Sequence, residues 1–256
     1  MCTTIILYRK DSSWPLIIGS NRDEKLDRKS LFPGRHWIKN HPNIIGGYDE
    51  LKGGTWIAIN DNGIFSVIHN RELIEDNKFK KKTRGNIILE LLKHNSIDES
   101  INYLRYLNQK LYNGFNIVLG NIERCIWAKH ESINKKITIN EVPEGLSVLT
   151  DKDLNDISDK KTRYYLNKLS QSPLPDLNNN NWLSWELLLS TNKIEQQEKV
   201  YESICFFDKE NNFGTRSSSL VALSNKISLN YIKNDVIFKS TNESPLNSNY
   251  IDVEID

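Results

Sequence analysis

The chain begins Met1-Cys2-Thr3-Thr4-Ile5-Ile6-Leu7-Tyr8, in which a cysteine precedes a β-branched and aromatic run. A run of this composition is typical of a buried β-strand. The turn-forming sequence Asp11-Ser12-Ser13 follows, and then a second apolar run, Leu16-Ile17-Ile18. We therefore predict two antiparallel strands joined by a loop, with Cys2 just before the first strand.

The second apolar run leads into the polar cluster Asn21-Arg22-Asp23-Glu24. In an antiparallel pair the end of one strand lies beside the start of the other, so the cluster is expected beside Cys2. The Asp23 carboxylate could hold or orient an amine there, and the Arg22 guanidinium would favour a thiolate.

Cys2 is a candidate nucleophile. Removal of Met1 is chemically easy because the next side chain is small, and it would leave Cys2 with a free α-amine. Such an amine has a pKa near 7.7–8.0 and can take the proton of its own thiol, so nucleophile and base arrive together. The alternative is an inert, buried cysteine, which is the residue's usual state.

The composition excludes several classes of protein. The 256 residues include 34 Lys and Arg against 33 Asp and Glu, a net charge of +1 that gives no support to a nucleic-acid partner. The densest basic run, residues 78–84, is most simply interpreted as a solvated segment leading into a helix.

Three cysteines are too few for a disulfide scaffold and favour a reducing compartment. No secretory signal and no apolar run of about 20 residues is visible, so we expect a cytoplasmic protein without an integral membrane segment. The five histidines show no metal-ligand spacing, and no metal site is expected.

The firmest local prediction is a β-hairpin. Residues 55–59 and 64–68 flank Asn60-Asp61-Asn62-Gly63, and Asn-Gly supplies the positive φ angles of a tight turn. Two helices should follow. Residues 84–94 carry apolar side chains at helical spacing, and Ser96-Ile97-Asp98-Glu99 is a capping-box sequence before a second apolar stripe.

Strands, helices and strands alternate in the rest of the chain. We expect strands at 115–119, 125–128, 136–139, 217–223 and 227–232, helices at 160–169 and 182–189, and a loop at 172–181. No internal repeat or long linker is present, which predicts one α+β domain over residues 1–256 with 241–256 as a peripheral tail.

Five short sequences, in this order, resemble one known family. They are Met1-Cys2, Gly19-Ser20-Asn21-Arg22-Asp23-Glu24, Gly53-Gly54-Thr55-Trp56, Tyr112-Asn113-Gly114-Phe115-Asn116 and Phe213-Gly214-Thr215-Arg216-Ser217-Ser218-Ser219. Together they resemble the NRDE proteins, also called the transport and Golgi organisation 2 family. That family is similar to the N-terminal nucleophile (Ntn) hydrolases, especially the bile-salt hydrolase and penicillin V acylase branch. The resemblance implies a four-layer αββα sandwich of two antiparallel sheets flanked by helices.

The resemblance also implies roles for individual residues. Cys2 matches the nucleophile, and Asp23 matches the aspartate of the Arg-Asn-x-Asp segment of the hydrolases. The arginine of that segment is Ser20 here, and Arg22 is the candidate to replace it. Asn70 matches an asparagine that donates to the oxyanion, a contact worth roughly 10²–10³ in rate. Asn60 competes for that role, although a plain turn residue is the commoner role at its position.

Three further positions matter for the resemblance. Arg216 matches an arginine near the C-terminal strands. Asp151 replaces an expected asparagine, and an ionised carboxylate at that position would repel an oxyanion. His69 stands where the family more often has threonine.

Three functions are compatible with these residues. The first is an Ntn-type cysteine hydrolase or acyltransferase that acts on an amide, ester or thioester acyl group. The bonds it would cleave include non-peptide C–N bonds and thioester bonds, and it would require no cofactor. The family is also associated with movement of haem and with acyl-CoA or lipid handling. The second is therefore a carrier for haem or an acyl-CoA, in which Arg22 and Arg216 pair with propionate or phosphate groups. The third is a degenerate scaffold that acts through partners.

Candidate ligand-binding residues are Asn21, Glu24, Trp56, Asn60 and His36. His36 is included because one axial histidine suffices for haem.

Overall fold

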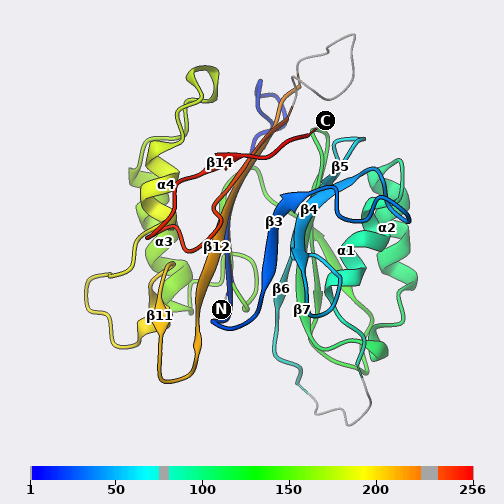
Figure 1. Cartoon of the computed structure of the whole chain (residues 1–256), viewed down its shortest axis with the longest axis horizontal. Coiled ribbons are helices and arrows are strands. Elements are labelled where there is room, and N and C mark those ends of the chain that lie inside the picture. Colours follow the sequence, from blue (N-terminus) through cyan, green and yellow to red (C-terminus); the bar gives the residue numbers. More distant parts are fainter. Residues whose placement is uncertain (1, 75–80, 226–235, 256) are drawn as a thin grey trace.

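Two antiparallel sheets lie face to face at the centre of the protein, and helices cover the outer face of each sheet (Figure 1). The structure is a computed structural model that describes residues 2–74, 81–225 and 236–255. Within these residues each sheet has seven strands. The predicted α+β fold, a four-layer αββα sandwich, is confirmed.

The first sheet contains both ends of the described chain. Its strand order is β10-β1-β2-β12-β13-β14, with β11 paired to β12. The strands are β1 (Thr3–Tyr8), β2 (Leu16–Lys25), β10 (Gly145–Leu149), β11 (Phe207–Asp208), β12 (Phe213–Leu223), β13 (Val236–Ser240) and β14 (Ile251–Asp252). The second sheet runs in sequence order from β3 to β9. Its strands are β3 (Ser30–Gly34), β4 (Ile44–Asp49), β5 (Ile57–Asn60), β6 (Phe65–Asn70), β7 (Phe115–Gly120), β8 (Cys125–His130) and β9 (Thr138–Glu141).

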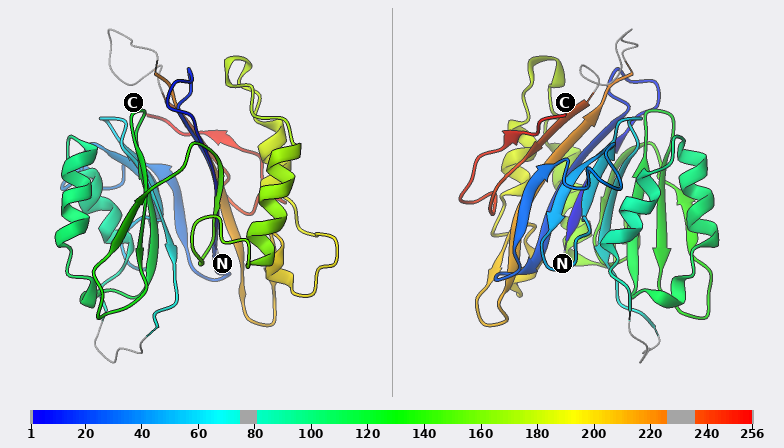
Figure 2. Two further views of the ribbon diagram at one scale, coloured as in Figure 1. Left: turned by 180° about the vertical axis from the view of Figure 1, so that it is seen from behind. Right: turned by 45° about the vertical axis from the view of Figure 1, so that its right-hand side comes forward.

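The helices form two pairs on opposite sides of the sandwich (Figure 2). α1 (Gly85–Leu92) and α2 (Ile97–Tyr106) cover the second sheet, whereas α3 (Lys160–Gln171) and α4 (Leu183–Leu189) cover the first. Among the described residues, no helix is both long enough and apolar enough to span a bilayer.

β1 is apolar at every position from Ile5 to Tyr8 because both of its faces are buried. Ile6 points into the layer between the sheets, whereas Ile5 and Leu7 point toward α3 and α4. Successive side chains of a strand face opposite ways, so a central strand of this sandwich needs apolar residues on both faces. That requirement explains why the apolar run at residues 5–8 predicts a buried strand.

Most predicted elements are confirmed, including the first strand pair, the hairpin and four helices. Gly63 adopts the expected positive φ of 70°, and Glu99 N–H donates to the Ser96 side chain as a capping box requires. One expectation differs from the structure, and one is not tested. β2 extends to Lys25, because it pairs with β12 along this whole length, and the strand expected at 227–232 lies outside the described residues.

The segment after β13 packs against the rest of the protein. β14 pairs with β13, Val253 is buried in the layer between the sheets, and the Tyr250 hydroxyl donates to Ser218 Oγ at 2.5 Å. The described part of 241–256 therefore adds to the core at one edge of the first sheet.

Candidate active site

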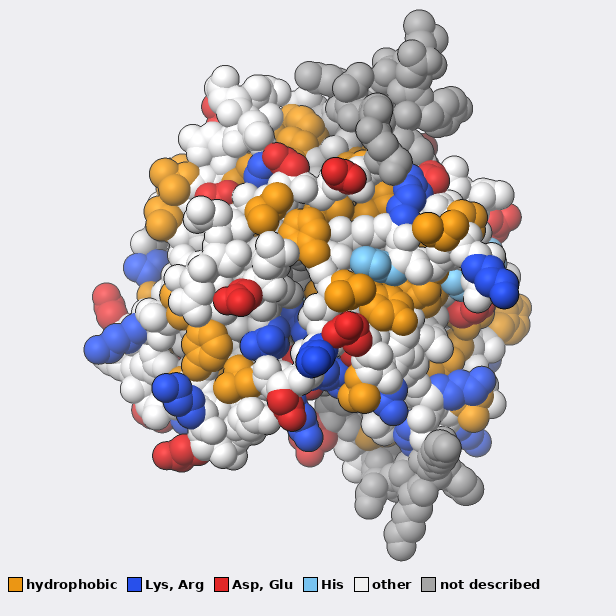
Figure 3. Space-filling model, in the orientation of Figure 1, with side chains coloured by type: hydrophobic (Ala, Val, Ile, Leu, Met, Phe, Trp, Pro, Cys, Tyr) orange, Lys and Arg blue, Asp and Glu red, His pale blue; other side chains and the backbone are white. Residues whose placement is uncertain are grey.

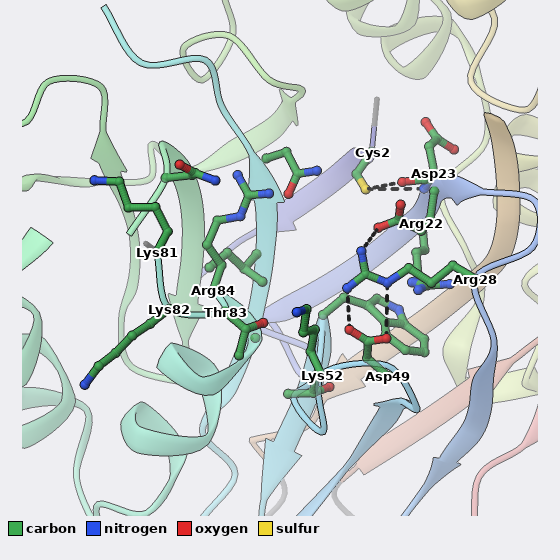
Figure 4. Close-up of a pocket in the computed structure, with 17 residues that line it drawn as sticks. Cys2, Arg22, Asp23, Arg28, Asp49, Lys52, Lys81, Lys82, Thr83 and Arg84 are labelled. Atoms are coloured by element: carbon green, nitrogen blue, oxygen red, sulfur yellow. Dashed lines mark hydrogen bonds and ion pairs between the residues drawn. The ribbon is translucent and has the colours of Figure 1, made fainter. Parts of the chain in front are cut away.

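Cys2 lies beside the Arg22–Asp23 corner, as the antiparallel pairing predicts. Thr3 pairs with Asn21 in the register of β1 and β2. Cys2 Sγ accepts a hydrogen bond from Asp23 N–H at 3.3 Å and donates to the Asp23 carbonyl at 3.5 Å (Figure 4). The main chain of β2 thus fixes the sulfur at the entrance to β1.

Cys2 borders a cavity of about 270 Å³ between the two sheets. Its lining includes Arg22 and Asp23 of β2, Trp56 and Asn70 near β5 and β6, and the chain that leads into α1. Basic and acidic side chains gather beside a hollow on this face of the molecule (Figure 3). The cavity therefore brings together residues from the first sheet, the second sheet and a helix start.

Arg22 is held inside this wall. Its side chain is only 5% exposed, its Cζ lies 4.4 Å from the centroid of the Trp56 ring, and Nη1 donates to Ser30 Oγ at 3.3 Å. Burial lowers the pKa of the Arg22 guanidinium from its ordinary value. Trp56 in turn lies against the main chain of Gly47, where a Cβ atom would collide with the indole ring.

The Asp23 carboxylate points toward β12. The Thr215 hydroxyl donates to Asp23 Oδ1 at 2.7 Å, and the same hydroxyl oxygen accepts from Phe206 N–H at 3.1 Å. Thr215 precedes an irregularity in the pairing of β12 with β2. This contact fixes the direction of the carboxylate.

Glu24 and Asp49 hold a second arginine that the sequence did not single out. Arg28 makes a two-point contact with Asp49, with distances of 3.2 and 2.5 Å, and a 2.9 Å ion pair with Glu24. Glu24 is therefore a cavity residue whose charge is offset inside the protein.

Burial and, to a smaller extent, the Asp23 carboxylate raise the pKa of the Cys2 thiol to about 11. A thiol with this pKa is protonated at neutral pH and needs a base before it can act as a nucleophile. Arg22, which we expected to favour the thiolate, does lower the pKa of Cys2, but by less than burial raises it.

Asn70 ends β6 at the cavity wall, and its side chain is exposed there. Asn60 instead anchors a turn: its amide donates to the carbonyls of Leu92 and His94, and its Oδ1 accepts from the main chain of the turn. The alternative assignment of Asn60 as an oxyanion donor therefore has no support, because its donors are used elsewhere.

Two other predicted ligand-binding residues lie outside the cavity lining. Asn21 is fully buried and donates to the carbonyls of Leu189 and Ile204, so it ties β2 to the helical layer. His36 contacts the Phe32 carbonyl at 2.8 Å through Nε2, in the connection between β3 and β4.

Asp151 and Arg216 are also outside the lining. Asp151 follows β10, the strand that pairs with the start of β1, and is 9% exposed with Lys152 Nζ at 3.5 Å. Arg216 lies at the irregularity in β12, and its buried Nε has no hydrogen-bond partner among the described parts of the chain.

His69 bridges the two sheets next to the cavity, a role that the sequence did not reveal. Its Nδ1 lies 3.2 Å from the Thr150 carbonyl, and its Nε2 lies 2.8 Å from Thr4 Oγ1, which contacts Ser20 Oγ. A carbonyl only accepts, so Nδ1 carries the proton and the Thr4 hydroxyl donates to Nε2. Burial lowers the pKa of His69 to about 4, and the ring is neutral at pH 7.

Known structures share this fold. An N-acylethanolamine-hydrolyzing acid amidase orthologue from Caenorhabditis elegans matches with a TM-score of 0.58 and 13% identity, over 92% of this chain and 98% of that one. A variant of conjugated bile acid hydrolase from Clostridium perfringens matches with a TM-score of 0.52 and 13% identity, over 98% and 92%. Penicillin V acylase from Agrobacterium tumefaciens matches with a TM-score of 0.50 and 14% identity, over 98% of this chain and 86% of that one. At these identities the likeness establishes the fold alone.

Sequence comparison gives a complementary result. The model of the family described as Transport and Golgi organisation 2 matches residues 1–236. Curated proteins gave no match.

Proposed function

The chain belongs to the Transport and Golgi organisation 2 family, and from this premise we propose that it cleaves or transfers an acyl group through Cys2. The substrate is an amide, ester or thioester of a carboxylic acid. The fold is that of an amidase, a hydrolase and an acylase, which makes an amide the first substrate to test.

The proposal depends on one observation: the Cys2 sulfur borders a cavity at the N-terminal start of a central strand, next to Arg22 and Asp23. Loss of Met1 would turn the α-nitrogen of Cys2 from a peptide amide into an amine. The Asp23 carboxylate lies on the adjacent strand and would help to hold that amine, and the amine would supply the base that a thiol of high pKa requires.

In the first half of the reaction, the α-amine takes the thiol proton and the sulfur attacks the acyl carbonyl carbon. A C–S bond forms, and the carbonyl electron pair moves to oxygen, where the Asn70 amide is the proposed donor. Collapse of this intermediate breaks the bond to the leaving group, which receives the proton from the α-ammonium.

In the second half, water attacks the thioester while the α-amine takes a proton from the water. The C–S bond breaks, the acid leaves, and the proton returns to sulfur. An acceptor amine or thiol in place of water would give acyl transfer. No cofactor enters these steps.

The decisive test compares the wild-type protein with Cys2→Ala. We expect release of free acid from an N-acyl amino acid or an acyl-CoA by the wild type, and a loss of at least about 10³-fold in the variant because the nucleophile is gone. Intact mass should show that Met1 is absent in the active protein. Equal rates in both proteins would contradict the proposal.

Thiol labelling against pH gives an independent check. Cys125 and Cys205 are buried, so we expect no label on them in the folded protein, and the rate should report on Cys2. We expect protein without Met1 to react at lower pH than protein that retains it, because the nearby α-ammonium favours the thiolate. In protein that retains Met1, the Cys2 thiol keeps its raised pKa of about 11.

The second candidate is a carrier that uses the same cavity. The high pKa of Cys2 and the cationic side chains of the lining favour it. Here an acyl-CoA or haem would bind without bond cleavage, and its phosphate or propionate groups would pair with arginine. Stable binding of an intact acyl-CoA by wild-type protein, without release of acid, would support this candidate over the first.

A further inference from the structure

The lining of the cavity carries more positive than negative charge. Its cationic residues are Arg22, Arg28, Lys52, Lys81, Lys82 and Arg84, and its acidic residues are Asp23, Glu24 and Asp49. Two of the three carboxylates, those of Glu24 and Asp49, are paired with Arg28. The wall therefore holds cations that these carboxylates do not neutralise.

The cations fall into two groups by direction (Figure 4). Lys81 and Lys82 turn their ammonium groups away from Cys2, and Lys81 Nζ donates to the Lys110 carbonyl at 2.7 Å. Arg84 and Lys52 extend toward the space in front of Cys2. Within residues 81–84, the described part of the basic run, the interpretation as a solvated segment is incomplete, because Arg84 forms part of the cavity lining.

Two guanidinium groups of this wall are desolvated without a counter-ion. Arg22 is 5% exposed, and its one hydrogen bond within residues 2–74, 81–225 and 236–255 goes to the neutral Ser30 hydroxyl. Arg84 Nη1 donates to the Gly114 carbonyl at 2.7 Å, and neither arginine has an ion pair in the same residues. Burial lowers the pKa of both groups, which reflects this cost of removing charge from water.

The start of α1 adds to the positive potential. Gly85 is its first residue, no side chain caps this end, and the first turn contains no acidic residue. A Cβ atom at Gly85 would lie 2.8 Å from the Thr55 carbonyl oxygen, so only glycine lets the helix start approach the segment before β5 this closely. Free N–H groups and the helix dipole at such an end favour an anion.

We propose that Arg22, Lys52, Arg84 and the first turn of α1 form an anion subsite, which binds a phosphate or carboxylate group of the ligand whose acyl carbon reaches Cys2. The ligand supplies the negative charge that the wall lacks. This inference rests on the proposed function for the acyl end of the ligand, and it narrows the substrate to acyl compounds that carry an anionic group.

Binding can be measured apart from catalysis by calorimetry on full-length Cys2→Ala protein. The probes are hexyl phosphate, hexanoate and the neutral hexanamide, which share one apolar chain. We expect at least one anion to bind about tenfold or more tightly than hexanamide, and its affinity to fall as salt is added. The tighter of the two anions identifies the group that the subsite prefers.

Arg84→Gln and Lys52→Gln, each added to Cys2→Ala, should weaken anion binding by about tenfold and about threefold and leave hexanamide unaffected. Lys82→Gln is the matched control, because it removes one charge from the same basic run but on a side chain that turns away. Lys52 is exposed, so its variant keeps the proposal testable should Arg84→Gln fail to fold.

Anion binding no tighter than that of hexanamide would overturn the inference, as would an equal loss in Lys82→Gln and Arg84→Gln. Turnover of neutral amides without any preference for anions would overturn the subsite but leave the proposed function intact. If the wild-type protein binds anions but releases no acid from any acyl compound, the subsite would stand and the proposed function would be overturned.

Discussion

The layer between the two sheets has two regions of opposite character. In its middle, Ile6, Ile18, Phe65 and Val67 pack together with essentially no exposure. At the end beside Cys2, polar side chains of Thr4, Ser20 and His69 connect the same two sheets by hydrogen bonds.

The difference shows how a sandwich can be stable and still have a defined cavity. Apolar packing stabilises the fold but is non-directional, whereas a satisfied hydrogen-bond network fixes the positions of its members. Thr4 lies two residues after Cys2 on the same strand, so the polar end positions the strand that carries the sulfur. We expect substitutions in the two regions to have different consequences.

The largest expected effect is in the apolar region. Phe65→Ala should lower the free energy of unfolding by about 3–5 kcal/mol, because it removes a fully buried ring and leaves a void. Urea unfolding measures this loss. A change under about 1 kcal/mol would mean that the middle of the layer does not stabilise the sandwich as described.

The next effect is a pH dependence at the polar end. The pKa of His69 is about 4 in the folded protein, and an ordinary unfolded histidine has about 6.5. Between these values the unfolded state binds more protons, so stability falls as pH decreases, by a total of roughly 3 kcal/mol. Above pH 6.5 the titration of His69 does not change the stability.

Unfolding measured from pH 7 to pH 4 should therefore show a steeper loss for the wild type than for His69→Gln, whose amide does not titrate. Carboxylates titrate in both proteins, and comparison of the two slopes removes their contribution. Parallel slopes would show that His69 is not buried as a neutral ring.

The smallest effect sharpens the contrast between two asparagines. Asn60→Ala should lower the free energy of unfolding by about 1–3 kcal/mol, because it leaves buried groups unpaired, and should leave acyl cleavage unchanged. Asn70→Ala should change stability by less than about 0.5 kcal/mol and reduce the rate by about 10²-fold. The opposite pattern would return the oxyanion role to Asn60.

Local sequence was sufficient where an element needs only its own residues. The strand at the N-terminus and the hairpin turn at Gly63 follow from apolar runs and from Asn-Gly. β3 was missed because it is an edge strand that contains Pro33, a residue tolerated there because an edge strand leaves one row of donors unpaired. The extension of β2 through charged residues depends on β12, which is nearly 200 positions away.

In the site too, local sequence predicts some positions, and others depend on the packing of distant segments. The proximity of Cys2 to Asp23 could be predicted, because the register of two adjacent strands decides it. Arg84 and Lys52 could not be assigned to the cavity, since their position depends on how the sheets and α1 pack. Asn21 was expected to bind a ligand, but its amide serves main-chain carbonyls that no sequence pattern announces.

Gly47 has a consequence for how selectivity could change. The indole of Trp56 lies against the main chain of Gly47, and Arg22 lies over that indole. Alanine at position 47 would displace the ring, and the guanidinium that lies over it would have to move as well. The shape of the cavity lining at Trp56 and Arg22 thus depends on a missing methyl group on β4, and a substitution there could alter it without replacing any charged residue.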